Sequence, residues 1–105
     1  MTNHEAMLAA LADPTRRTIF EWLARSPSAV GELARELPVS RPAVSQHLKV
    51  LKSAGLVSDY AAGTRRVYSV DPAGVAVIRD YFEQFWLQSL TRFRAAASHP
   101  IQEET

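Results

Sequence analysis

At 105 residues, 47% of them hydrophobic, the chain is long enough for one domain with a modest core, and this composition excludes general disorder. It contains no cysteine, which excludes disulfides, thiolate nucleophiles and cysteine-based metal or redox-sensing sites. It has neither an apolar run of about 18 residues nor a charged-then-apolar leader, so we expect a soluble, cytoplasmic protein without a membrane partner.

The net charge of +1 conceals an uneven distribution of charge along the chain. Residues 41–66 contain five cationic side chains and one carboxylate, so this segment carries +4 and the rest of the chain −3. A basic segment on an otherwise mildly acidic domain is typical of a protein that binds a polyanion.

The first 25 residues are expected to form two helices. Residues 4–11 are rich in Ala and Leu, which favour a short helix. Asp13 then predicts the N-cap of a second helix, with Pro14 at its first position, that runs to about residue 25. Arg16 and Arg17 lie near its start, where the helix dipole disfavours cations, so they are either solvated or directed at a phosphate. The apolar side of the first helix consists of Met7, Leu8 and Leu11.

A third helix is expected to begin at Ser28, which can cap it, and to end at Leu37 and Pro38. Val30 and Leu33 form its buried stripe together with Leu37. The charged residues of this helix are expected to form a solvated face with no role beyond solubility. These residues are Glu32, Arg35 and Glu36.

Residues 40–55 carry the signals for both ends of a fourth helix. Ser40 is a good N-cap, Pro42 is tolerated in the first turn, and Gly55 can adopt the left-handed conformation that ends a helix. Only residues 38–39 separate this helix from the third one, so the pair predicts a helix-turn-helix. The apolar stripe of the fourth helix consists of Val44, Leu48 and Leu51.

The opposite face of this helix combines three cations with short polar side chains and has no carboxylate. Such a surface suits the major groove of DNA, because Arg and Gln can contact base edges while Ser and Lys contact phosphates. The DNA contacts expected on this helix are Ser40, Arg41, Pro42, Ser45, Gln46, His47, Lys49 and Lys52.

After Gly55 the pattern changes to two short β-prone runs, residues 56–60 and 65–70, joined by a four-residue turn. This pattern predicts a two-stranded hairpin, the wing, with Tyr68 and Val70 packed inward. Arg65 and Arg66 beside the turn are either solubility residues or contacts to the DNA backbone. The adjacent basic helix favours the second interpretation.

Asp71 and Pro72 predict the start of a long last helix that reaches about residue 97, followed by a polar tail, residues 98–105, that frays. The apolar residues of this helix spread too widely for one small domain to cover, which favours an interface over a helix that wraps its own core. The chain is therefore expected to be a single domain, residues 1–105, mainly α with five helices and a two-stranded wing. The expected dimer contacts are Met7, Leu8, Leu11, Phe82, Phe85, Trp86, Leu90 and Phe93.

Several ordered motifs resemble the ArsR/SmtB family of bacterial winged helix-turn-helix repressors. The motifs are ALADPTRR at residues 10–17, VGELA at 30–34, SRPAVSQHLKVL at 40–51, AGLV at 54–57 and GTRRVY at 63–68. The similarity covers nearly the whole chain. It implies a homodimer formed by the first and last helices, with one recognition helix per subunit in the major groove and the wings along the flanking DNA. Repressors of this type often control their own promoters.

Metal-sensing members of that family carry cysteines at positions that here are Ala29, Gly31 and Ala34, so the resemblance is to metal-independent members. The last helix offers carboxylates but no histidine. We therefore expect no metal and no cofactor. No effector is indicated by the sequence. The three histidines lie on different elements without partners at helical spacing, and they are His4, His47 and His99.

Three other functions agree less well with the sequence than a DNA-binding regulator does. An enzyme is not expected, because no catalytic set converges within one element and no glycine-rich phosphate loop is present. A winged-helix module for protein–protein contact would predict a mixed-charge face on residues 41–53, which is instead all cationic. RNA binding would favour stacking aromatics on the basic face, and these are missing.

Overall fold

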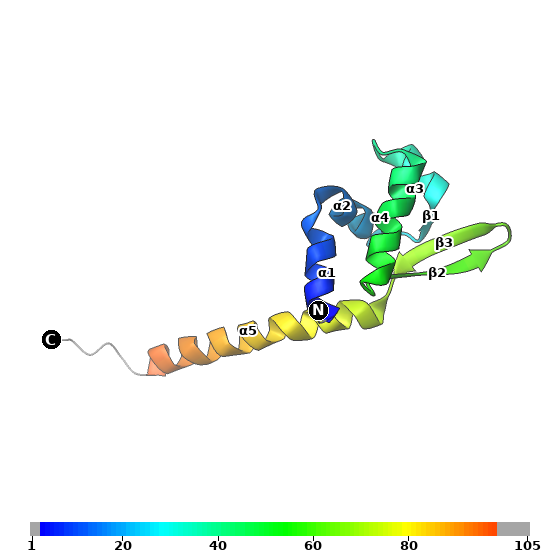
Figure 1. Ribbon diagram of the computed structural model, residues 1–105. Coiled ribbons are helices and arrows are strands. Elements are labelled where there is room, and N and C mark those ends of the chain that lie inside the picture. Colours follow the sequence, from blue (N-terminus) through cyan, green and yellow to red (C-terminus); the bar gives the residue numbers. More distant parts are fainter. Residues whose placement is uncertain (1–2, 99–105) are drawn as a thin grey trace.

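The computed structural model describes residues 3–98, and within them it contains five helices and three strands (Figure 1). The fold class expected from the sequence is confirmed, with one additional short strand. The expected tail lies outside the described residues except for Ser98, which ends the last helix. The elements are α1 (Asn3–Ala12), α2 (Pro14–Arg25), β1 (Ser28–Ala29), α3 (Val30–Glu36), α4 (Arg41–Ser53), β2 (Val57–Ala62), β3 (Arg65–Val70) and α5 (Pro72–Ser98).

Three helices begin where the sequence predicts, because each predicted side chain binds a backbone N–H of the first turn that has no partner within the helix. The acceptor–donor distances are 3.0 Å from Asp13 to Arg16, 3.3 Å from Ser40 to Ala43 and 3.0 Å from Asp71 to Ala73. These caps confirm the predicted starts of α2, α4 and α5.

The start of α3 differs from the prediction. Ser28 does not cap the helix, because it lies one residue before the cap position in β1, where it pairs with Tyr68 of β3, and its hydroxyl donates to the carbonyl of Ser26 at 3.0 Å. The N-cap is Ala29, and the carboxylate of Glu32 accepts its N–H at 2.7 Å. Glu32 therefore has a structural role that a merely solvated residue would lack.

The wing belongs to a three-stranded antiparallel sheet with the strand order β1-β3-β2. Ala62 pairs with Arg65, so the turn is two residues long rather than four, and Gly63 supplies the positive φ of +67° that it needs. Tyr68 and Val70 pack against the core as expected, but both are only half-buried. Their neighbour Val67 is more buried, at 9% exposure. The sequence prediction missed this, because it did not include β1, which pairs with Val67 through Ala29.

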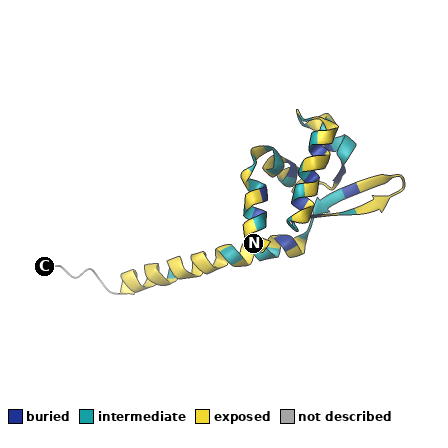
Figure 2. Cartoon of the chain, in the orientation of Figure 1, coloured by how far each residue is buried: buried dark blue, intermediate teal, exposed yellow. Residues whose placement is uncertain are grey.

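One hydrophobic core lies beneath α4 and is shared by α1, α2, α3 and the base of the wing. The predicted stripe of α4, Val44 with Leu48 and Leu51, is fully buried, which orients the opposite face of α4 outward. Figure 2 shows buried residues gathered in this body, whereas most of α5 is exposed.

Arg16 and Arg17 both bind the backbone of α1, and Arg17 remains exposed. The Nε of Arg16 donates to the carbonyl of Ala10 at 2.8 Å, and a terminal nitrogen of Arg17 donates to that of Leu11 at 2.9 Å. Both arginines thus satisfy carbonyls at the C-terminus of α1, where the helix dipole favours cations. These hydrogen bonds stabilise the connection between α1 and α2.

The end of α4 and the start of α5 meet at two glycines. Gly55 has a φ of +85° and donates to the carbonyl of Lys52, while Leu56 donates to that of Leu51, which is a Schellman ending. A Cβ on Gly74 would lie only 1.9 Å from the carbonyl oxygen of Gly55. The first turn of α5 can therefore pack on this ending only because residue 74 has no side chain.

Beyond this junction α5 packs mainly on α1 and then extends away from the body (Figure 1). Its 27 residues correspond to a length of about 40 Å. No helix within residues 3–98 combines the length and hydropathy that crossing a membrane requires.

Candidate nucleic-acid interface

The outward face of α4 is a continuous surface of exposed polar and cationic side chains. Its members are Ser40, Arg41, Pro42, Ser45, Gln46, Lys49 and Lys52, and all of them are exposed. Ser40, Arg41 and Pro42 form the N-terminal end of this surface, and the other residues follow along the helix. No carboxylate interrupts this face of the helix. The structure therefore places seven of the eight side chains predicted for α4 on one accessible surface.

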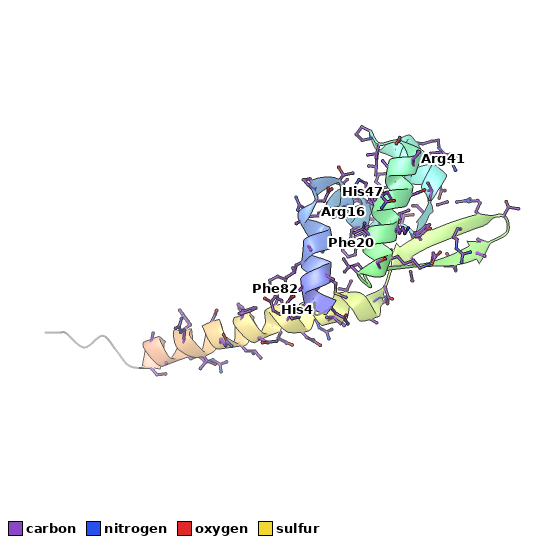
Figure 3. The ribbon with its side chains drawn as sticks, viewed as in Figure 1. His4, Arg16, Phe20, Arg41, His47 and Phe82 are labelled. Carbon is purple, nitrogen blue, oxygen red and sulfur yellow. The ribbon has the colours of Figure 1, made fainter. Side chains whose placement is uncertain are left out.

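His47 is the exception among the residues predicted to contact DNA. It is half-buried, and its Nδ1 is buried without a hydrogen-bond partner within residues 3–98. The reason is its position three residues after Val44, which places it on the flank of the buried stripe. In Figure 3 the ring lies on the side of α4 toward Arg16 and Phe20, within the body of the protein. His47 therefore lies at the edge of the exposed face of α4, and its contact with DNA stays a prediction.

The wing adds two cations to this surface. Arg65 and Arg66 lie at the start of β3, directly after the turn, with side chains 55% and 58% exposed. Their strand pairs with β2, which follows the C-terminus of α4 after a short connection. Helix and wing thus provide two neighbouring positively charged elements.

Asp59 of β2 joins these two elements electrostatically. Its carboxylate oxygens lie 2.7 Å from Nζ of Lys52 and 2.6 Å from Nε of Arg66. The Asp59 side chain is only 6% exposed, whereas both cations remain more than half exposed. The hydrogen bond from Lys52 has the largest effect on the pKa of Asp59, and the one from Arg66 the next largest. Both hold this pKa below its ordinary value, so the carboxylate is charged at neutral pH.

A second carboxylate, Glu32 of α3, pairs with the other wing arginine. Its Oε1 lies 2.8 Å from a terminal nitrogen of Arg65, and the same oxygen accepts the N–H of Ala29. The backbone hydrogen bond from Ala29, followed by the charge of Arg65, lowers the pKa of Glu32. Glu32 therefore both caps α3 and ties α3 to the wing, two roles that the sequence analysis did not assign.

Arg41 and Lys49 have no ion pair with any carboxylate within residues 3–98. The Arg41 guanidinium lies beside Gly31, and a Cβ on residue 31 would be 3.4 Å from its nearest nitrogen. These two cations are available to an external anion without first giving up a partner.

Of the eight residues predicted to form a dimer, four are exposed, three are half-buried and one is buried. Met7 is 2% exposed and belongs to the chain's own core, because α1 packs on α2 and α4 through that side. Leu8, Leu11 and Leu90 are half-buried. The aromatic surface of α5 consists of four side chains, with exposed fractions of 51% at Phe82, 46% at Phe85, 63% at Trp86 and 70% at Phe93. Leu87, which the sequence analysis did not name, is 53% exposed as well.

Contacts between aromatic rings join the two terminal helices. His4 of α1 stacks on Tyr81 of α5 with ring centroids 4.0 Å apart, and Tyr81 in turn meets the edges of Phe82 and Phe85. The aromatic surface is therefore continuous with α1. Within residues 3–98 no group of three or more His, Asp or Glu side chains is arranged to hold a metal ion.

The comparison with known proteins identifies the family. A model of bacterial regulatory proteins of the arsR family matches residues 13–59, from the Asp13 cap through α4 into β2. The HTH-type transcriptional regulator Rv2034 of Mycobacterium tuberculosis is 66% identical over 84 residues, which cover 80% of this chain and 78% of the relative. The chain belongs to the ArsR family. It is a DNA-binding transcriptional regulator, and the expectation of a non-enzymatic protein agrees with this membership.

Two further proteins extend the comparison of this ArsR-family protein. The transcriptional repressor SdpR of Bacillus subtilis is 37% identical over 62 residues, 59% of this chain and 69% of the relative. A solved ArsR-like transcriptional regulator from Rhodococcus sp. RHA1 superimposes with a TM-score of 0.77 at 31% identity, covering 89% of this chain and 88% of that one. The winged-helix architecture is thus shared with a solved member of the family.

Proposed function

We propose that this ArsR-family protein is a homodimeric repressor that acts in the cytoplasm and binds an inverted-repeat operator, including one in its own promoter. Residues 1–105 form a single DNA-binding domain in which α1 and α5 supply the dimer contacts. The observation that carries the proposal is the uninterrupted polar and cationic face of α4, flanked by the wing arginines. Repression is supported by the similarity to SdpR, which is named a transcriptional repressor.

In this proposal the N-terminal half of α4 enters the major groove. Arg41, Ser45 and Gln46 are exposed there, and Gln46 can bind adenine through two hydrogen bonds. Lys49 and Lys52 lie further along the helix and are assigned to phosphates, together with Arg65 and Arg66 of the wing.

The dimer follows from the exposed aromatic surface of α5. A single helix-turn-helix covers too little DNA for tight and specific binding, whereas a two-fold dimer reads two half-sites at once. The half-site centres should then lie about 10–10.5 base pairs apart, or a multiple of that distance.

The direct test is to enrich duplexes from a random pool with the wild-type protein and to footprint DNA upstream of its own gene. An inverted repeat in the enriched sequence, protected on both half-sites, is the expected result. Gln46→Ala should weaken binding to that duplex by about 1–3 kcal/mol and change binding to random DNA little. Gln84→Ala, an equal change on exposed α5, is the matched control. Failure to enrich any sequence would contradict the proposal and favour a protein–protein module.

A further inference from the structure

A nearly covered carboxylate lies between the cationic face of α4 and the wing arginines. Asp59 is the only carboxylate between residues 41 and 66, and it lies on β2 between Lys52 of α4 and Arg66 of β3. A carboxylate near DNA repels phosphates, so its presence between these cations calls for a physical reason.

The geometry of the two ion pairs supplies that reason. Arg66 donates to Asp59 through Nε, which leaves both terminal nitrogens of the guanidinium available. Lys52 approaches the other carboxylate oxygen with a single ammonium group that carries three donors. Both side chains remain more than half exposed while Asp59 is covered. Each cation can therefore bind Asp59 and a phosphate at the same time.

We propose that Asp59 is a positioning residue for DNA binding, whose carboxylate fixes Lys52 of the recognition helix and Arg66 of the wing as one phosphate-binding unit. The inference rests on the proposed function and assigns a further residue to it. Phosphate contacts determine the register of a protein on the duplex, and register determines which bases α4 can reach. Loss of the Asp59 charge should therefore reduce sequence discrimination more than overall attraction to DNA.

The first test is Asp59→Asn, which keeps the size of the side chain and one acceptor oxygen but removes the charge. Dissociation constants are measured for the enriched duplex and for a random duplex of equal length, over a series of salt concentrations. Binding to the enriched duplex should weaken about tenfold, because Lys52 and Arg66 lose their common anchor. Binding to the random duplex should stay equal or strengthen, because the surface gains one positive charge.

Asp80→Asn is the matched control, because it changes the net charge equally. It removes an exposed carboxylate from an ion pair with Arg79 on α5, away from α4 and the wing. Its ratio of the two dissociation constants should equal that of the wild type. The proposal is overturned if Asp59→Asn binds the enriched duplex at least as tightly as the wild type does, since Asp59 would then act only by repulsion.

A second measurement does not depend on the folding of the Asp59 variant. Lys52→Gln and Arg66→Gln alter exposed side chains, singly and together. If the two cations form one unit, the double variant should bind no more than about threefold weaker than the weaker single variant. Independent, multiplicative losses would overturn the proposal. A wild type that binds both duplexes equally would instead refute the proposed function, and with it this inference, whatever the Asp59 variant does.

Discussion

Gly74→Ala tests the junction between α4 and α5. The added Cβ would lie 1.9 Å from the carbonyl oxygen of Gly55 and 2.9 Å from its carbonyl carbon. Real Cβ atoms essentially never lie closer than 3.0 Å to such an atom, so the two backbone segments would have to move apart by about 1.1 Å. The backbone there cannot yield easily, because Leu56 donates to Leu51 and accepts from Asp71. Overpacking commonly costs about 1–3 kcal/mol, and contact with fixed backbone places this case at about 3 kcal/mol or more.

Such a loss is a large part of the stability of a small domain, which is typically about 5–15 kcal/mol. The assay is urea unfolding followed by circular dichroism at one fixed protein concentration, because association would shift the midpoint. Gly31→Ala is the matched control. Its Cβ would meet only the far end of the long Arg41 side chain, at 3.4 Å, so this variant should unfold at a midpoint close to that of the wild type. Equal midpoints for Gly74→Ala and wild type would refute the described packing.

Three further predictions concern salt, association and pH. Lys49→Ala should weaken binding to all duplexes about equally and reduce the salt slope by about one unit, and an unchanged slope would remove Lys49 from the phosphate contacts. Trp86→Glu should convert a sedimenting dimer into a monomer, because an unpaired charge would be buried in the interface. A wild type that sediments as a monomer at micromolar concentration would contradict the dimer. The stability that Asp59 contributes should be fully present above its unfolded pKa of about 3.8 and be lost as the pH falls through its lower folded value, so Asp59→Asn should flatten the acid limb of a stability–pH profile.

Most of the fold could be predicted from local signals. Asp13, Ser40 and Asp71 cap helices through contacts to residues only two or three positions away, so their roles depend on short sequence windows. The buried stripe of α4 follows in the same way from the helical period. These two signals together predict α4 and the direction of its exposed face.

The features that the sequence did not reveal all depend on distant partners. Strand β1 has only two residues and exists because β3 pairs with it. The role of Asp59 depends on its contacts with Lys52, seven positions before it, and with Arg66, seven positions after it. Periodicity alone does not predict these contacts. The clue available in the sequence was that Asp59 is the one acidic residue in a basic segment.

The contact of Gly74 with Gly55 also has a consequence for the DNA sequences that this regulator can accept. With no room for a methyl group, the angle between α4 and the first turn of α5 is fixed by backbone against backbone. In a dimer held together through α5, the separation of the two α4 helices would then be determined by how the α5 helices pair. The aromatic surface of α5 would therefore determine the spacing of the operator half-sites although it contacts no base. Substitutions on this surface would change the preferred spacing without changing the base sequence of each half-site.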